Sequence, residues 1–212
     1  MKIFYLDTSS NYLYTAILED TKVISEIKEK LERDLSRLAL FKIEEMFKNN
    51  NMDLNDIEKI IVVNGPGSFT GVRIGLTIAK TISWAKKIPI IQISSLEAMA
   101  LSSDSKYNYT VPAIDARRNY VFATIYDNVN KSFILKEQYI SINTLEAAMG
   151  NLGDDITYIS NDKLDTEYSI QEYVPDISYI VENVMNREGI NPHSVDANYL
   201  KLTEAEEKLN AN

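Results

Sequence analysis

The chain has 212 residues, of which 45% are hydrophobic and 25% charged, as expected for one large or two small globular domains. Its net charge of −9 argues against unaided binding of a polyanion such as RNA, unless a local basic patch or a partner supplies clustered cations. The absence of cysteine and the single histidine, His193, exclude disulfides, thiolate nucleophiles, cysteine-type zinc sites, two-histidine metal motifs and most serine triads. No apolar run suits a signal peptide or a membrane span, so we expect a cytoplasmic protein without membrane contact.

Apolar β-branched runs and helical periodicity predict the order β-β-β-α-β-α-β-α for the first half of the chain. The predicted strands are 3–7, 12–18, 23–27, 60–63 and 90–93, and the predicted helices are 34–47, 72–87 and one that begins at 95. Ser94, with Glu97 three residues later, is a candidate cap for the last of these helices. In the helix 34–47, helical spacing predicts one apolar face made of Leu35, Ala39, Leu40, Ile43, Met46 and Phe47. Leu38 and Phe41 fall outside that face.

A glycine-rich loop lies between the strand 60–63 and the helix 72–87. Gly65 and Gly67 permit a sharp turn, and Ser68 or Thr70 can cap the helix. Backbone donors and a positive dipole end meet there, which suits an anion. The loop lacks the Gly-Lys-Ser/Thr ending of a Walker A motif, and Thr70 stands where a dinucleotide loop needs glycine. We therefore favour a structural strand-to-helix turn over a phosphate site.

The second half of the chain begins like the first. Its predicted strands are 110–115, 120–127, 133–139 and 157–160, and its predicted helices are 143–149 and 176–187. Residues 6–14 overlay on 114–122 without gaps, so that Asp7 matches Asp115 at an offset of 108. This internal duplication predicts two lobes, 1–103 and 104–212. A duplicated βββαβα unit is similar to the two-lobed actin-like ATPase (ASKHA, RNase H-like) fold, an α/β class.

In that fold two hairpins clamp the phosphates of a nucleotide, and their aspartates help to hold magnesium. The corresponding hairpins here are poor in glycine, so Asp7 and Asp115 are predicted to cap their own turns. The residues that would form nucleotide or anion loops are Asp7, Thr8, Ser9, Gly65, Gly67, Ser68, Thr70, Asp115, Arg117 and Arg118. We expect Arg117 and Arg118 in a turn that faces the cleft between the lobes and holds an anion, with solvated surface charge as the alternative.

Several segments together resemble the TsaB (YeaZ) family, and they span nearly the whole chain. They are 6–9, 65–75, 88–89, 94–98, 115–118, 199–201 and 204–206. The resemblance implies a non-catalytic scaffold of the tRNA threonylcarbamoyladenosine (t6A) machinery that binds and activates TsaD and works with the ATPase TsaE. It implies a homodimer without TsaD, tRNA contact only through the complex, and no cofactor in the isolated chain, with ATP or ADP and Mg²⁺ at the shared interface.

The sequence departs from the related families at two positions. TsaD carries a histidine metal motif on its first long helix, whereas 33–38 has no histidine and predicts no metal site. Leu35 stands where TsaB usually has histidine, and Asn119 where the family usually has glycine. The alternative function is an ATP-dependent transferase or kinase that uses Asp7, Asp115 and the loop 65–71. A peptidase, suggested by the old glycoprotease label, is not expected.

The helix 72–87 predicts a partner surface, because its apolar residues cover roughly 200° of its circumference and a helix on its own sheet needs about 100°. The predicted partner residues are Leu35, Leu38, Phe41, Gly71, Arg73, Ile74, Gly75, Ile78, Ala79 and Ile82. Gly71, Gly75 and Ala79 would let another backbone come close, or serve packing against the sheet. The alternative is that the second lobe covers these faces.

Overall fold

The computed structural model describes residues 1–103, 106–150, 152–153 and 155–201. The chain divides into two compact units, each with a five-stranded sheet. Unit 1 consists of Met1–Ser102 and Val174–Ala197, and unit 2 of Ser103–Tyr173 with the chain from Asn198 onward. The predicted division at residue 103 therefore misplaces 174–197, which returns to unit 1. In the part of the chain that the structure describes, no helix has both the length and the apolar character needed to cross a membrane.

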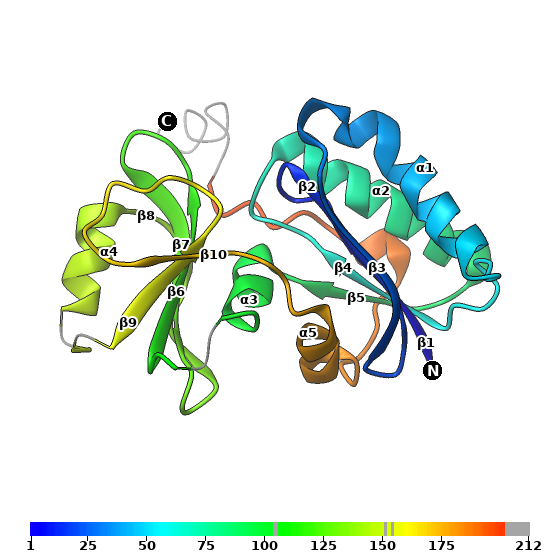
Figure 1. The fold of residues 1–212 in the computed structure, drawn as a ribbon. Coiled ribbons are helices and arrows are strands. Elements are labelled where there is room, and N and C mark those ends of the chain that lie inside the picture. Colours follow the sequence, from blue (N-terminus) through cyan, green and yellow to red (C-terminus); the bar gives the residue numbers. More distant parts are fainter. Residues whose placement is uncertain (104–105, 151, 154, 202–212) are drawn as a thin grey trace. The chain divides into compact units, whose positions relative to one another are not determined.

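The sheet of unit 1 has the strand order β3-β2-β1-β4-β5 (Figure 1). β1, β2 and β3 are antiparallel neighbours, whereas β4 and β5 run parallel to β1. The strands are β1 (Lys2–Asp7), β2 (Tyr12–Glu19), β3 (Lys22–Lys30), β4 (Lys59–Val63) and β5 (Ile90–Ile93). The helices are α1 (Leu35–Asn49), α2 (Phe69–Lys86), α3 (Ser95–Ala100) and α5 (Ile177–Val184). β1 and β4 are almost continuously apolar because both of their faces are buried.

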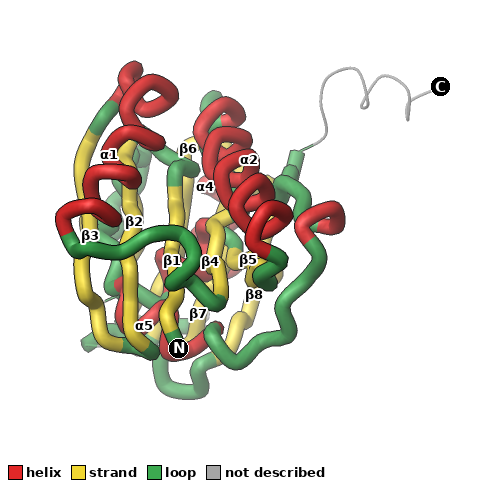
Figure 2. Tube along the Cα trace, turned by 90° about the vertical axis from the view of Figure 1, so that its right-hand side faces the viewer, coloured by secondary structure: helices red, strands yellow, loops and turns green. Residues whose placement is uncertain are grey.

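α1 and α2 lie side by side on one face of this sheet (Figure 2). The predicted core face of α1 is confirmed at five of its six residues, but Leu40 is 60% exposed. Leu38, predicted to lie outside the core face, is half-buried and packs against the core. Both leucines lie at the edges of the apolar stripe, where periodicity does not decide which edge a neighbouring element covers.

The sheet of unit 2 has the order β10-β9-β6-β7-β8, with β6, β7 and β8 antiparallel and β9 and β10 parallel to β6. Its elements are β6 (Tyr109–Asp115), β7 (Tyr120–Asp127), β8 (Ser132–Ser141), α4 (Ile142–Met149), β9 (Ile156–Ser160) and β10 (Ile170–Glu172). The sequence did not predict β10, whose three residues are too few to show a period. The last predicted helix is α5, which packs in unit 1, where the Ser178 hydroxyl donates to the Thr21 carbonyl (2.6 Å). Among its described residues, unit 2 therefore has no counterpart of the second helix of the predicted repeat.

The hairpins β1–β2 and β6–β7 overlay in sequence but differ in register by one residue. Asp7 pairs with Tyr14, whereas Asp115 pairs with Val121 and not with Phe122, the residue aligned with Tyr14. Because side chains alternate between the faces of a sheet, a shift of one residue moves aligned side chains of one strand to opposite faces.

Candidate functional site

The predicted anion loop of unit 1 is packed against the turn after β1. The Ser68 N–H donates to the Ser9 carbonyl (2.7 Å), and the Thr8 hydroxyl donates to the Gly71 carbonyl (2.7 Å). A Cβ atom at Gly67 would lie 2.2 Å from the Ser9 carbonyl oxygen, and one at Gly71 would lie 2.1 Å from that of Thr8. The glycines are therefore needed for close approach of two backbone segments.

The donors at the start of α2 are largely used within this arrangement. Ser68 caps the helix, since its hydroxyl accepts from the Gly71 N–H (3.2 Å), and its carbonyl accepts from the Val72 N–H (2.8 Å). Thr70 lies inside the first turn and is not the cap. Gly65, at φ 98°, turns the chain, and its carbonyl accepts from the Ser95 N–H (2.9 Å). These contacts favour a structural role for the loop.

Asp7 and Asp115 each cap the turn at the end of their strand, as the sequence predicts. The Ser9 N–H donates to the Asp7 carboxylate and the Arg117 N–H to that of Asp115, both at 2.8 Å. Asp7 is buried, and desolvation raises the pKa of its carboxyl above the ordinary value despite the hydrogen bonds from Ser9. Asp115 is exposed. Among the described residues, no group of three or more His, Cys, Asp or Glu side chains is placed to hold a metal ion.

The predicted nucleotide or anion residues thus fall into two sets, one in each unit. The structure brings together those of unit 1, which are Asp7, Thr8, Ser9, Gly65, Gly67, Ser68 and Thr70. The other three, Asp115, Arg117 and Arg118, form the turn between β6 and β7 in unit 2. The predicted turn position of both arginines is confirmed, whereas their orientation toward a cleft stays a prediction.

The predicted partner surface needs correction, because half of its ten residues are buried inside unit 1. The buried residues are Leu35, Gly71, Gly75, Ala79 and Ile82. The close backbone approach expected at the small residues is made by the chain's own turn after β1, since a Cβ atom at Gly75 would lie 2.4 Å from the Thr8 hydroxyl oxygen. These five residues therefore belong to the interior of unit 1 and do not form a surface for a partner.

An apolar groove of about 480 Å³ nevertheless remains between α1 and α2. It is lined by Ser36, Ala39, Leu40, Phe69, Thr70, Arg73, Ile74, Thr77 and Ile78. Leu40, Phe41 and Phe69 are 60%, 55% and 54% exposed, and the Arg73 guanidinium lies 3.7 Å from the centre of the Phe69 ring. We call the exposed or half-buried residues Leu40, Phe41, Phe69, Arg73, Ile74 and Ile78 the α1–α2 face. The sequence prediction missed Leu40, assigned to the core, and Phe69, placed before the helix.

Two sheets, each with three antiparallel strands and then parallel strands, place the protein in the two-lobed actin-like ATPase fold class, as predicted. A family model described as TsaD, tRNA N6-adenosine threonylcarbamoyltransferase, matches residues 22–191. The tRNA threonylcarbamoyladenosine biosynthesis protein TsaB of Bacillus subtilis is 31% identical, with 98% of this chain and 97% of that protein covered. The chain therefore belongs to the TsaB (YeaZ) family, which is related to TsaD, and the predicted family is confirmed.

One further comparison concerns the family and another concerns the fold. TsaB of Escherichia coli (strain K12) is 32% identical over 58% of this chain and 53% of that protein. The structure titled YeaZ from Pseudomonas aeruginosa covers 94% of this chain and 99% of that chain with a TM-score of 0.75. Because the two sequences are only 19% identical, this likeness shows the shared fold alone.

Proposed function

We propose that this chain is a non-catalytic scaffold subunit of the t6A machinery, which binds and activates a TsaD-family protein. In this proposal it works with the ATPase TsaE, contacts tRNA only within the assembled complex and pairs with a second copy when TsaD is absent. Support comes from the relatives, which are named for tRNA threonylcarbamoyladenosine biosynthesis. The structural observation that carries the proposal is the exposed α1–α2 face.

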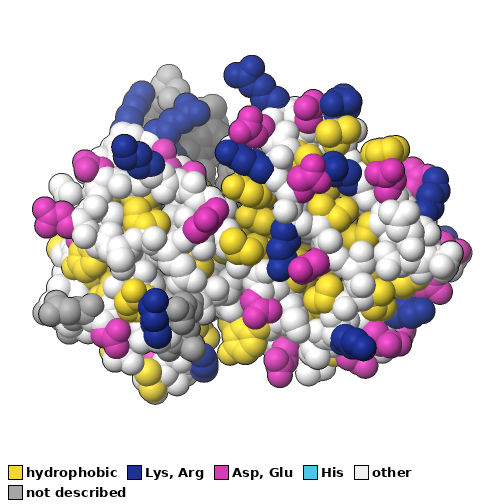
Figure 3. Space-filling view, in the orientation of Figure 1, with side chains coloured by type: hydrophobic (Ala, Val, Ile, Leu, Met, Phe, Trp, Pro, Cys, Tyr) yellow, Lys and Arg dark blue, Asp and Glu magenta, His cyan; other side chains and the backbone are white. Residues whose placement is uncertain are grey.

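The α1–α2 face has the character of an interface centre. Leu40, Phe41 and Phe69 expose more than half of their surface. Contact of such apolar side chains with water is unfavourable, so burying them against a partner would lower the free energy. Grouped apolar and aromatic side chains beside an arginine are typical of the buried centre of protein–protein interfaces. Figure 3 shows charged side chains of both signs interspersed with apolar groups of different sizes over the face that it presents.

Co-purification with the TsaD homologue from the same genome tests this proposal. The double change Leu40→Glu with Phe41→Glu should leave a folded chain and weaken binding by about 2 kcal/mol or more, roughly 30-fold, because it places charges in an apolar contact. Leu38 is unsuitable for such a change, since it packs against the core.

The matched control is Val129→Glu with Ile134→Glu, which adds the same charge at exposed apolar positions of unit 2. Circular dichroism and size-exclusion chromatography establish that both variants are folded. A folded Leu40/Phe41 variant that co-elutes with the TsaD homologue as wild type does would place the partner surface elsewhere.

We further propose that ATP or ADP with Mg²⁺ binds only at the interface formed with the partner. In unit 1 the loop that would cradle phosphates is filled by the Ser9 carbonyl at Gly67, and its donors at Ser68 and Gly71 are already bonded. Isothermal titration of the isolated chain with Mg-ATP should therefore give no binding heat. Saturable binding that is lost in an Asp7→Ala variant would instead support the transferase or kinase alternative.

A further inference from the structure

The tip of the β6–β7 hairpin displays two arginines on an unusual backbone. Arg117, Arg118 and Asn119 have φ values of 68°, 55° and 62°, so three consecutive residues without glycine are left-handed. Several hydrogen bonds fix this conformation, including Tyr120 N–H to the Arg117 carbonyl (3.1 Å) and Ile142 N–H to the Asn119 carbonyl (3.0 Å). The tip is therefore held in place by the start of α4 as well as by its own strands.

Both arginine side chains are exposed, and neither guanidinium makes an ion pair or a hydrogen bond with any described residue. This is notable in a chain with 31 acidic residues and 22 lysines and arginines. Figure 3 shows Lys and Arg side chains gathered over the end of this hairpin, at the upper left. The Asp115 carboxylate, the nearest acidic group in sequence, is engaged by the Arg117 N–H and not by a guanidinium.

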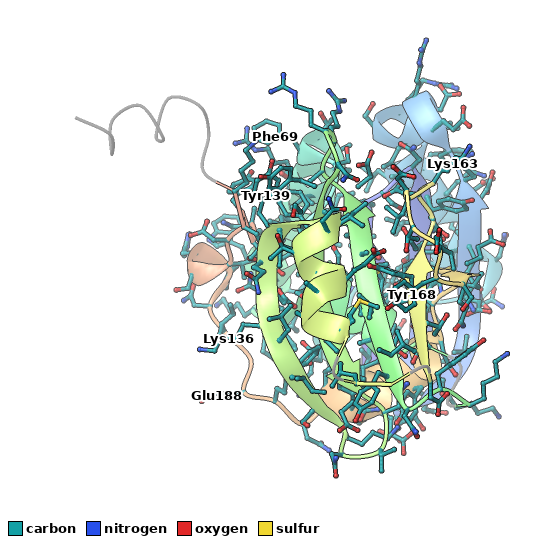
Figure 4. All side chains as sticks on the ribbon, turned by 90° about the vertical axis from the view of Figure 1, so that its left-hand side faces the viewer. Phe69, Lys136, Tyr139, Lys163, Tyr168 and Glu188 are labelled. Carbon is teal, nitrogen blue, oxygen red and sulfur yellow. The ribbon has the colours of Figure 1, made fainter. Side chains whose placement is uncertain are left out.

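An aromatic stack adjoins the arginine pair. Tyr120, the residue directly after the tip, stacks on Tyr139 with ring centres 4.7 Å apart and planes 14° from parallel. The Lys201 ammonium lies 4.8 Å from the centre of the Tyr139 ring, near the end of β8 (Figure 4). Tyr120 keeps 39% of its surface exposed, so part of its ring remains open to solvent.

We infer that this tip binds a single-stranded segment of RNA, with Arg117 and Arg118 on phosphates and a base against Tyr120. Guanidinium groups match phosphate geometry, and aromatic rings beside cations are the usual platform for unpaired bases. The alternative ligand, an acidic protein segment, would pair with the two arginines but would not use the stacked rings of Tyr120 and Tyr139. Two phosphate contacts on an acidic chain are too few for binding alone, so the inference rests on the proposed function and places the contact in the assembled complex.

The test measures binding of a fluorescently labelled tRNA transcript by the complex of this chain with its TsaD and TsaE homologues. In Arg117→Gln with Arg118→Gln, we expect the dissociation constant to rise roughly tenfold and the slope of log affinity against log salt to fall by about 1.4, or about 0.7 for each single-strand phosphate contact. Tyr120→Ala should weaken binding about fivefold or more without changing the slope, because stacking is not ionic.

Three controls make the result specific. Lys22→Ala with Lys48→Ala removes the same charge from exposed sites of unit 1 and should leave the slope unchanged. Arg117→Lys with Arg118→Lys should keep the slope, and Tyr120→Phe should keep the affinity. If the Arg117→Gln with Arg118→Gln variant does not fold, the Arg117→Lys with Arg118→Lys variant takes its place in the test. A folded variant with both lysines that loses the salt dependence of tRNA binding would overturn the assignment.

Failure of the inference is distinguishable from failure of the proposed function. If the glutamine variant assembles and binds tRNA with the wild-type affinity and slope, the tip does not contact RNA while the scaffold role stands. If the glutamine variant instead loses its TsaD homologue, the tip is a protein interface and the RNA assignment is wrong. A wild-type chain that never assembles with the TsaD homologue would refute the proposed function itself.

Discussion

The turns after β1 and β6 are built alike but lie in different surroundings. Each begins with an aspartate whose carboxylate accepts the N–H two residues further on, at the same distance of 2.8 Å. Asp7 is 2% exposed and lies near the glycine loop, whereas Asp115 is exposed at the base of an open tip. The aspartate therefore stabilises the same local turn in both units, but the two turns do not form equivalent binding sites.

The difference arises from the segment after the next parallel strand of each sheet. After β4, the glycine loop runs over Thr8 and Ser9 and begins a long helix. After β9, a polar turn takes that place, and the Asp162 carboxylate accepts the Asp115 N–H (2.9 Å). The hairpin in unit 2 therefore has no glycine loop packed on it, and it can present charged side chains.

The register shift separates the two turns further. In β1, Phe4 and Leu6 contribute to the core that contains α1 and α2. In β6, Val111 and Ala113 face the core of unit 2, and in the overlay they correspond to residues 3 and 5. Aligned positions of β1 and β6 therefore lie on opposite faces of their sheets, and the aligned aspartates do not point to equivalent sides.

Among changes that compare the two units, we expect Gly71→Ala to have the largest effect on stability. Alanine would gain about 1 kcal/mol of helix propensity, but its Cβ atom would lie 2.1 Å from the Thr8 carbonyl oxygen. Because that neighbour is backbone, we expect a net loss of about 2–3 kcal/mol in the free energy of unfolding, measured by urea denaturation.

Gly150→Ala in unit 2 is the matched control. Its Cβ atom would meet the carbonyl oxygens of Ala147 and Glu146 at 3.5 and 3.9 Å, which are ordinary contacts. Stability should stay within about 0.5 kcal/mol of wild type or rise slightly. Equal stability of the two variants would mean that the glycine loop is not seated on the turn after β1.

Much of the fold could be predicted because its elements depend on local pattern. The apolar run of β4, the caps at Ser68 and Ser94, and the aspartate turns all depend on a few neighbouring residues. The sequence pattern predicts the start of α2 three residues too late, because Gly71 in its first turn is a poor helix former, and only the close contact with Thr8 explains a glycine there. The return of α5 to unit 1 depends on tertiary packing that no local pattern reports.

The candidate surfaces were harder to predict for a related reason. Periodicity shows how far apolar residues spread around a helix, but it does not show which of them its own sheet covers. Thus Ile82 and Leu35 proved to be core, while Leu40 proved to be exposed. The tip at Arg117 and Arg118 was located correctly, but neither its left-handed backbone nor the neighbouring Tyr120–Tyr139 stack could be seen in the sequence.

The smaller expected effect concerns the charge of Asp7 and appears as a dependence of stability on pH. Burial raises the pKa of its carboxyl above the ordinary value of 3.8, while the hydrogen bonds from Ser9 offset part of that rise. Between the two pKa values the folded state binds more protons than the unfolded state. The contribution of Asp7 to the free energy of unfolding is therefore fully present below pH 3.8 and is lost as the pH rises through the folded pKa.

The change Asp7→Asn removes this titration while keeping an oxygen that accepts the Ser9 N–H. We expect the stability of the variant, relative to wild type, to increase with pH above 3.8 and then to level off, as measured by urea denaturation at a series of pH values. Asp115→Asn makes the same chemical change in the turn of unit 2, where the carboxylate is exposed. If the Asp7 variant and wild type keep a constant difference across this range, the carboxyl is not desolvated, and the contrast between the two turns would have to rest on packing alone.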